Sequence, residues 1–197
     1  MAKSGGGSTA TDSSGNGNTG SLINGPAWVS GKYGGALNFN GSDTYVSVPD
    51  NPNGSLDPSA ITVTAWVNIP SLPTSYGNIV AKGANSGYRF RISNDGKVAW
   101  FDRGATNTIG SDSPISLNTW THIAVTGDVS GLKIYINGIL DESNEVSYAA
   151  PDTSDSLKIG AETAFNEYFN GLIDDVRVYN VVLSQPQVQD VMNNISF

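Results

Sequence analysis

Oxygen-bearing side chains occur at every second position near the N-terminus: Asp12, Ser14, Asn16 and Asn18, with a glycine directly after Asn16. Ca²⁺ prefers oxygen ligands, and the first half of an EF-hand calcium loop has this spacing. The second half is missing, because the twelfth position holds Ile23 instead of a bidentate glutamate. The stretch therefore predicts half of a calcium site that needs an acid from elsewhere, with an ordinary Gly/Asn turn as the alternative.

A second candidate ligand is Asp174, within residues 169–179. Valine, isoleucine, tyrosine and phenylalanine are dense there and no helix breaker follows Gly171, which predicts a strand. Because side chains alternate along a strand, the expected faces are Leu172, Asp174, Val176 and Val178 on one side, and Ile173, Asp175, Arg177 and Tyr179 on the other. A carboxylate in an apolar row is costly unless it is hydrogen-bonded, paired or bound to a metal.

Residues 88–102 combine aromatic and charged side chains in a predicted hairpin, joined through Asn94-Asp95-Gly96. Sugars stack their apolar faces on aromatic rings and hydrogen-bond to charged and amide groups. A strand pairing that gathered the candidate ligand-binding residues on one surface would make a glycan platform from Arg89, Arg91, Trp100, Asp102 and Arg103. The alternative is that Trp100 packs inside the protein. The loops 70–78, 84–87, 104–114 and 161–167 are equally good places for recognition.

The sequence favours a protein that is not an enzyme. Glycosidases need two carboxylates flanking the sugar bond, and the pattern Glu-x-Asp-x-x-Glu is absent. Four glutamates lie in stretches rich in Gly, Ser and Asn: Glu142, Glu145, Glu162 and Glu167. The single histidine, His122, falls in a predicted core strand without an evident nucleophile, which indicates a structural role.

Composition limits the possible partners. The 197 residues suit one domain, and the net charge of -8 argues against nucleic acid, because phosphate binding needs a basic surface. No apolar run is long enough to cross a membrane. The Gly/Ser-rich residues 1–10 are expected to be a flexible leader to a domain of residues 11–197, and they lack the apolar core of a signal peptide. A domain of a larger secreted protein, a processed chain and a virion component all fit.

The remaining chain reads as about a dozen short strands separated by hairpin turns such as Asn40-Gly41 and Asn137-Gly138. The cleanest alternation is residues 61–69, with Ile61, Val63, Ala65, Val67 and Ile69 on the core face. A short helix is expected within 183–193, capped by Ser184 with Pro186 in its first turn. This pattern predicts an all-β, two-sheet antiparallel sandwich or jelly roll with a short C-terminal helix.

Several stretches together resemble the laminin-G-like domains of the concanavalin A-like lectin/glucanase superfamily. They are Asp12 to Asn18, Gly34 to Gly41, Ile61 to Val67, Trp120 to Thr126, Ile134 to Gly138, and Phe169 to Asn180 with Leu183-Ser184 after it. The resemblance covers about residues 12–192 and implies a jelly roll whose terminal strands lie side by side. It also implies a structural Ca²⁺ near those strands, with Asp12, Asn18 and Asp174 as ligands and Asn16 and Asp43 as further candidates.

The resulting functional expectation is a calcium-stabilised, lectin-like module that binds carbohydrate or a glycosylated surface, without nucleic-acid binding or membrane insertion. It would act in adhesion or targeting, outside the cell or on a cell or virion surface. A structural decoration or fibre protein of a virion or cell-surface assembly is the second hypothesis. A glycoside hydrolase is a remote third, because a shared fold does not fix function.

Overall fold

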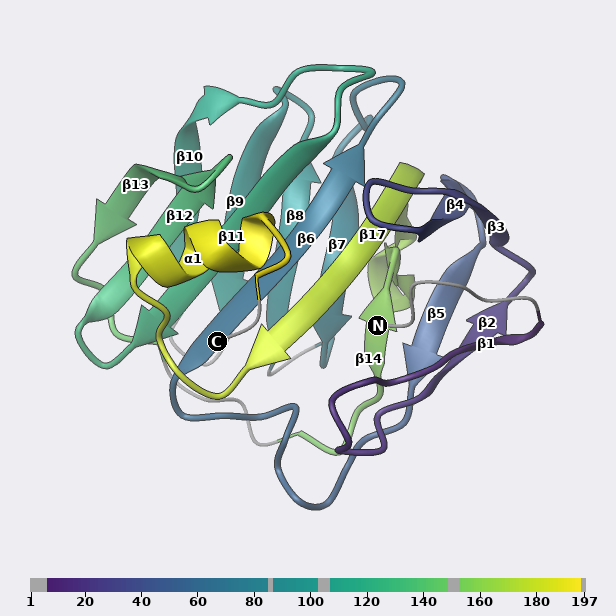
Figure 1. Ribbon diagram of the computed structural model, residues 1–197, viewed down its shortest axis with the longest axis horizontal. Coiled ribbons are helices and arrows are strands. Elements are labelled where there is room, and N and C mark those ends of the chain that lie inside the picture. The colour runs from purple at the N-terminus through teal and green to yellow at the C-terminus, as the bar shows by residue number, and fades with distance from the viewer. Residues whose placement is uncertain (1–6, 85–86, 103–106, 149–152, 196–197) are drawn as a thin grey trace.

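The structure is a computed structural model and describes residues 7–84, 87–102, 107–148 and 153–195. It confirms the expected sandwich, in which two large antiparallel sheets pack face to face (Figure 1). The eight-stranded sheet has the order β1 (Thr9–Ala10), β2 (Gly20–Ile23), β5 (Tyr45–Val48), β14 (Leu157–Ile159), β7 (Tyr76–Lys82), β8 (Tyr88–Ser93), β9 (Lys97–Asp102) and β10 (Asn107–Pro114).

The seven-stranded sheet forms the other layer. Its order is β13 (Ile139–Asn144), β12 (Gly131–Ile136), β11 (Thr121–Asp128), β6 (Ile61–Asn68), β17 (Asn170–Tyr179), β4 (Gly35–Asn40) and β3 (Ala27–Ser30). A small hairpin, β15 (Ala161–Glu162) and β16 (Glu167–Tyr168), is closed by the 3-10 turn η1 (Thr163–Phe165). Contacts of both hairpin strands with β7 place this hairpin beside the eight-stranded sheet.

The core lies between the two sheets, and the alternation in β6 is confirmed there. Ile61, Val63, Ala65 and Val67 are all fully buried in the main apolar cluster. Each such side chain contributes roughly 1.5–3 kcal/mol by leaving water, less for alanine. The last two residues of the expected leader belong to the sandwich, because Thr9 and Ala10 pair with β2 and Ala10 is buried in the same cluster. Residues 1–6 lie outside the described residues.

The expected helix is α1 (Gln185–Met192), which lies across the outer face of the seven-stranded sheet (Figure 1). The Ser184 backbone N–H and hydroxyl both donate to Oε1 of Gln187, which fixes the first turn. Val188 and Val191 are buried in a second, smaller apolar cluster. This cluster also contains Ala124, Tyr135 and Leu183. The short helix is therefore held on the sheet by its buried apolar side chains.

The single alternation predicted for β17 is wrong, because a β-bulge interrupts it. Asp174 is opposite Trp66 and Arg177 is opposite Thr64. Three steps along β17 therefore correspond to two steps along β6, so β17 contains one extra residue. Asp175 adopts a left-handed φ of 48° at this point. One extra residue reverses which side chains face inward, so Ile173 and Val176 both join the core. Asp174 lies instead on the outer face of the sheet.

Candidate functional site

The structure does not assemble the predicted glycan platform, because β8 and β9 pair in a register that separates its members. Phe90 is opposite Trp100, whereas Arg91 is opposite Ala99. Trp100 is therefore on the inner face, fully buried and stacked on Tyr88 with 5.0 Å between ring centroids. This register places Tyr88, Phe90 and Trp100 on the inner face, where they are removed from water. Trp100 therefore packs inside the protein, as the second interpretation of the sequence expected.

The other predicted members have different positions. Asp102 is opposite Tyr88 on the inner face and is fully buried. Arg89 and Arg91 lie on the outer face of the eight-stranded sheet with Phe101 between them, 5.3 and 5.4 Å from the two guanidinium carbons. Arg103 lies outside the described residues. Of the predicted set, only the two arginines lie on an outer face in the described structure.

That outer surface holds a compact polar and aromatic network. The guanidinium of Arg91 lies 3.5 Å from the centroid of the Tyr76 ring, and that of Arg89 lies 4.2 Å from the Phe165 ring. These are cation–π contacts at close range. Arg89 also donates to the carbonyl oxygen of Ala84 at 2.7 Å. Burial lowers the pKa of Arg91, although Tyr76 and Glu167 act in the opposite direction.

Glu167 joins this network from the hairpin beside the sheet. Its Oε2 accepts a hydrogen bond from Nδ2 of Asn78 at 2.9 Å and lies 3.8 Å from Nη1 of Arg91. Three buried polar atoms in or beside the network have no hydrogen-bond partner among the described residues: Nε of Arg91, Oδ1 of Asn78 and Oε2 of Glu162. Unsatisfied buried groups are uncommon, and a bound water or ligand is one way in which such groups obtain a partner.

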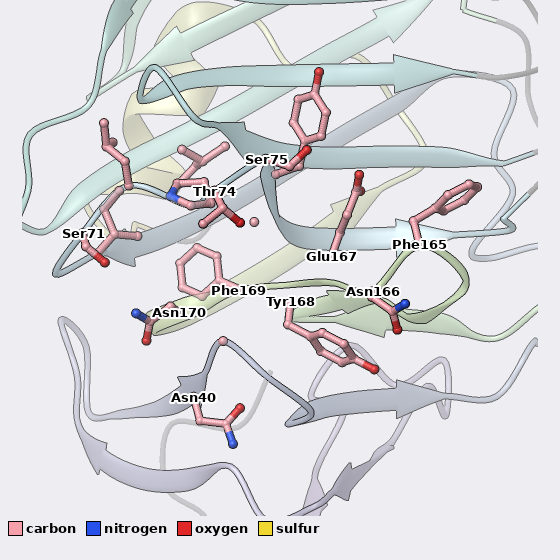
Figure 2. A pocket seen from close by; sticks show the side chains of 17 residues that line it. Asn40, Ser71, Thr74, Ser75, Phe165, Asn166, Glu167, Tyr168, Phe169 and Asn170 are labelled. Carbon is pink, nitrogen blue, oxygen red and sulfur yellow. The ribbon is translucent and has the colours of Figure 1, made fainter.

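A pocket of about 350 Å³ opens next to Glu167 (Figure 2), within the range of small-molecule sites. Three chain segments form its walls: the β4–β5 turn, the loop 71–77 and the segment 165–170. The side chains that give the walls their chemistry are Asn40, Ser71, Thr74, Ser75, Tyr76, Phe165, Asn166, Glu167, Tyr168 and Asn170. The pocket thus combines aromatic rings with amides, hydroxyls and one carboxylate.

Local backbone chemistry brings these walls together. Phe169 is buried against Phe39 and exchanges backbone contacts on both sides: its N–H donates to Gly160 and its carbonyl accepts from Gly41. Gly41 has a φ of +73°, and a Cβ there would lie 2.9 Å from Cβ of Asn170, so only glycine allows this approach. Asn166 ends η1 with a left-handed φ of 55°, which asparagine tolerates.

Sequence reasoning indicated the loops but not the residues. The loops 70–78 and 161–167 were expected as places for recognition, and both line the pocket. Glu162 and Glu167 were expected in loops, yet they are paired opposite each other on β15 and β16, and Glu162 is fully buried. The signal available in the sequence was the density of Tyr, Phe, Asn and Glu within residues 165–170.

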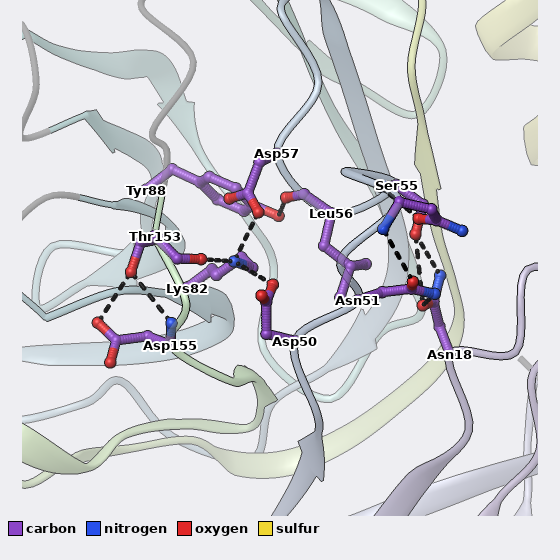
Figure 3. Close-up of polar contacts among 11 residues, drawn as sticks. Asn18, Asp50, Asn51, Ser55, Leu56, Asp57, Lys82, Tyr88, Thr153 and Asp155 are labelled. Carbon is purple, nitrogen blue, oxygen red and sulfur yellow. Dashed lines mark hydrogen bonds and ion pairs between the residues drawn. The ribbon is translucent and has the colours of Figure 1, made fainter.

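The predicted calcium ligands are placed in two groups. Asp12 accepts hydrogen bonds from the backbone N–H of Ser14 and of Asn18, both at 2.9 Å. Partial burial alone would raise the pKa of Asp12, but these bonds outweigh it and lower that pKa. The Asn18 side chain is engaged by Asn51 at 2.9 Å and Ser55 at 3.1 Å (Figure 3). Asn16 contributes its carbonyl to Asn51. The Asp43 carboxylate accepts from Asn40 at 2.7 Å.

Asp174 has a different environment. Its Oδ2 accepts the backbone N–H of Tyr33 at 2.8 Å, while Arg177 forms its ion pair with Asp175 at 2.8 Å. Burial raises the pKa of Asp174, and backbone hydrogen bonds oppose that shift. In the groove of about 960 Å³ lined by residues 12–18, β17 contributes Asp175 rather than Asp174. The described residues contain no group of three or more His, Cys, Asp or Glu side chains that could hold a metal ion. Two of the predicted ligands are asparagines, so this finding does not decide the expected set of Asp12, Asn16, Asn18 and Asp174, and calcium stays a prediction.

His122 has the surroundings of a structural residue. It is 1% exposed, with its ring 5.4 Å from that of Trp66 on the outer face of the seven-stranded sheet. Burial lowers the pKa of His122 to about 4, so the ring is neutral at physiological pH. None of the residues that line the two cavities described above is a histidine.

A match to a family model defines the family of this chain. Residues 40–189 match the Laminin_G_3 family, described as the concanavalin A-like lectin/glucanases superfamily, and the chain belongs to this family. No curated protein matches the sequence. Among the described residues, no helix has the length and apolar character required to span a membrane.

Solved structures show the same fold. Domain 4 of AbnA, a GH43 extracellular arabinanase from Geobacillus stearothermophilus solved with arabinotriose, is 25% identical, with a TM-score of 0.70 over 85% of this chain and 81% of that one. The binding domains of Paraclostridial Mosquitocidal Protein 1 and of botulinum neurotoxin serotype G are 21% and 18% identical, with TM-scores of 0.74 and 0.76. Each match covers 93% of this chain, which spans only about half of either toxin domain (49% and 48%). These two likenesses concern the fold alone.

Proposed function

We propose that this chain is a carbohydrate-binding module and that the pocket beside Glu167 is its binding site. The observation that carries the proposal is the pocket wall itself: a half-buried carboxylate held by Asn78, next to Tyr76, Tyr168 and Phe165. Carboxylates and amides hydrogen-bond to sugar hydroxyls, and aromatic rings take the apolar faces of the sugar. The likeness to an arabinanase domain solved with arabinotriose supports the same reading.

The experiment is a glycan array followed by calorimetric titration of the chain with arabinotriose and with any array hit. Tyr168→Ala removes a half-buried ring from the pocket and is expected to weaken binding at least tenfold, about 1.4 kcal/mol. Tyr45→Ala is the matched control, because Tyr45 is also half-buried but lies on β5 and does not line the pocket. Equal affinities for both variants, or no binding to any glycan, would contradict the proposal.

The proposed module is non-catalytic. Glycosidic cleavage requires two carboxylates that both reach the sugar bond. Glu167 is the single carboxylate among the described residues that line the pocket, and Glu162 behind it is fully buried. Glu162 is held by the N–H of Ala164 at 3.0 Å and lies 3.8 Å from Nζ of Lys158. We expect no release of reducing ends from common polysaccharides, and measurable release would overturn this part of the proposal.

Adhesion or surface targeting and a structural calcium ion complete the proposal. The first is supported by the likeness to a domain of an extracellular arabinanase. For the ion, the oxygen-rich loop of Asp12, Asn16 and Asn18 is the place where Ca²⁺ would be held. The contacts of Asp174 with Tyr33 argue that this carboxylate is not one of the ligands.

A further inference from the structure

We propose that the pocket selects neutral oligosaccharides over anionic ones, with Glu167 as the acceptor of sugar hydroxyls and with Asn78 and Arg91 as its positioning residues. This inference rests on the proposed function of the same pocket. It concerns the chemical class of the ligand, which the family and the structural neighbours leave open.

The charges around the pocket disfavour anionic sugars. Among the described residues that line it, Glu167 is the only acidic or basic side chain, and the rest are amides, hydroxyls, aromatic rings, apolar side chains and glycines. No lysine, arginine or histidine of the described ranges lines the pocket. A carboxylate or sulfate on a sugar would therefore meet a like charge without a cation to pair with. The net charge of -8 adds a repulsive field at low salt.

The two nearby arginines do not alter this balance. Arg89 is 6% exposed, donates to the carbonyl of Ala84 and packs against Phe165. Arg91 is 7% exposed and packs on the Tyr76 ring. Both cations are directed at aromatic rings in the wall rather than into the pocket, so neither offers a bidentate site for an anion.

The contacts of Glu167 fix its carboxylate as an acceptor for sugar hydroxyls. Asn78 holds Oε2 at 2.9 Å, whereas Arg91 is at 3.8 Å, longer than a hydrogen bond. The carboxylate is therefore fixed in place but not neutralised by a bidentate pair. Its Oε1 accepts no hydrogen bond from any described residue, and the side chain remains 15% exposed. An oriented carboxylate with spare acceptor capacity binds donors, and sugar hydroxyls are donors.

The test compares matched neutral and anionic ligands by calorimetric titration at one salt concentration. Arabino-oligosaccharides and cello-oligosaccharides serve as neutral probes, and oligogalacturonates and sialyllactose as anionic ones. The wild-type chain is expected to bind a neutral probe at least tenfold more tightly than any anionic probe. Glu167→Gln keeps the shape but removes the charge, so it should weaken neutral binding and strengthen anionic binding. Glu145→Gln, at an exposed position outside the pocket, is the charge-matched control.

Positioning by Arg91 is tested with Arg91→Lys, which keeps the positive charge but loses the planar contact with Tyr76. Neutral binding should weaken at least threefold while anionic binding changes little, so the neutral-to-anionic ratio should fall at least threefold. A general structural defect would instead lower both affinities equally and leave the ratio unchanged. Anionic probes that bind as tightly as neutral ones, or a ratio unchanged in Glu167→Gln, would refute the selectivity and leave carbohydrate binding intact. If no probe binds, the selectivity and the proposed function are refuted together.

Discussion

Lys82 and Arg91 are buried cations on neighbouring strands of one sheet, and their partners differ. The ammonium group of Lys82 lies 2.9 Å from Asp50, 2.8 Å from Asp57 and 2.5 Å from the carbonyl oxygen of Thr153 (Figure 3). An ammonium group has three donors, so this cation is fully satisfied. Arg91 has five donors, yet its only ion pair among the described residues is the 3.8 Å contact with Glu167, and its Nε has no partner there.

The difference separates a buried ion cluster that holds the fold together, which we call the clamp, from the proposed recognition site. Lys82 ties together the strand β7, the loop that carries Asp50 and Asp57, and the segment at Thr153, and it is 0% exposed. All of its interaction capacity is used inside the fold. Glu167 lines the pocket and keeps an acceptor oxygen unused by the described residues, and Arg91, which packs behind the wall, leaves its Nε without a partner there. We infer that saturation of a buried charge indicates a structural role, and incomplete saturation beside a cavity indicates binding.

The strongest test of this comparison is Lys82→Met, which leaves two carboxylates near the core without their cation. Breaking a buried ion pair costs about 3–5 kcal/mol, and we expect the lower part of this range because Asp50 is 26% exposed. Urea unfolding at pH 7 measures the change. Lys133→Met, at an exposed position on β12, is the control and should change stability by less than about 0.5 kcal/mol.

Arg91→Met completes this comparison. It should cost less than half as much stability as Lys82→Met, because Arg91 loses one long ion pair and its ring contacts with Tyr76 and Phe101 rather than two close carboxylates. It should also weaken glycan binding, which Lys82→Met should leave unchanged in the folded fraction. Equal stability losses for the two variants would remove the distinction between clamp and recognition site.

The sequence was sufficient for the sandwich but not for the bulge or the site. The alternation of β6 and the capping of α1 are local patterns, so both could be predicted within a few residues. The bulge depends on Asp175 adopting a left-handed φ of 48°, which no alternation of residue types reveals. That one residue moved Asp174 away from the face to which the calcium prediction assigned it.

The candidate site depends on contacts between distant segments. Asn78 and Glu167 are 89 positions apart, and Lys82 and Thr153 are 71 apart. Loop composition could indicate that residues 70–78 and 161–167 serve recognition, yet not that they share one pocket. Trp100 was ambiguous for a different reason: its burial is decided by the β8–β9 register, which fixes the face of every side chain in the hairpin.

His122 allows the comparison to be tested by a change of pH. Its ring is buried, its Nδ1 has no partner among the described residues, and it lines neither cavity. Burial lowers the pKa of His122 from 6.5 to about 4 in the folded chain. The unfolded chain thus binds the proton of His122 more tightly than the folded chain does. The free energy of unfolding is therefore not reduced by His122 above pH 6.5, and it falls as the pH decreases from 6.5 to 4. The loss is roughly 3 kcal/mol at most, at about 1.36 kcal/mol per unit of pKa.

His122→Phe keeps a ring against Trp66 and removes the titration, so its stability should fall less between pH 6.5 and 4. Asp174 contributes with the opposite sign, because burial raises its pKa and the folded chain then binds that proton more tightly. Urea unfolding of the wild type, His122→Phe and Asp174→Asn across this pH range checks both statements. The same slope in wild type and His122→Phe would contradict the lowered pKa of His122.

The smallest expected effect concerns Asp174, whose carboxylate resembles Lys82 in being engaged by the fold itself. Asp174→Ala leaves the Tyr33 N–H without its acceptor and should cost about 1–3 kcal/mol. Asp174→Asn keeps an acceptor oxygen without a charge, and because burial raises the pKa of Asp174, this variant should change stability by less than 1 kcal/mol. Both melting temperatures are to be measured in calcium and in EDTA. If Asp174 is held by hydrogen bonds, each shift is the same in both conditions; a shift confined to calcium would instead make Asp174 a metal ligand.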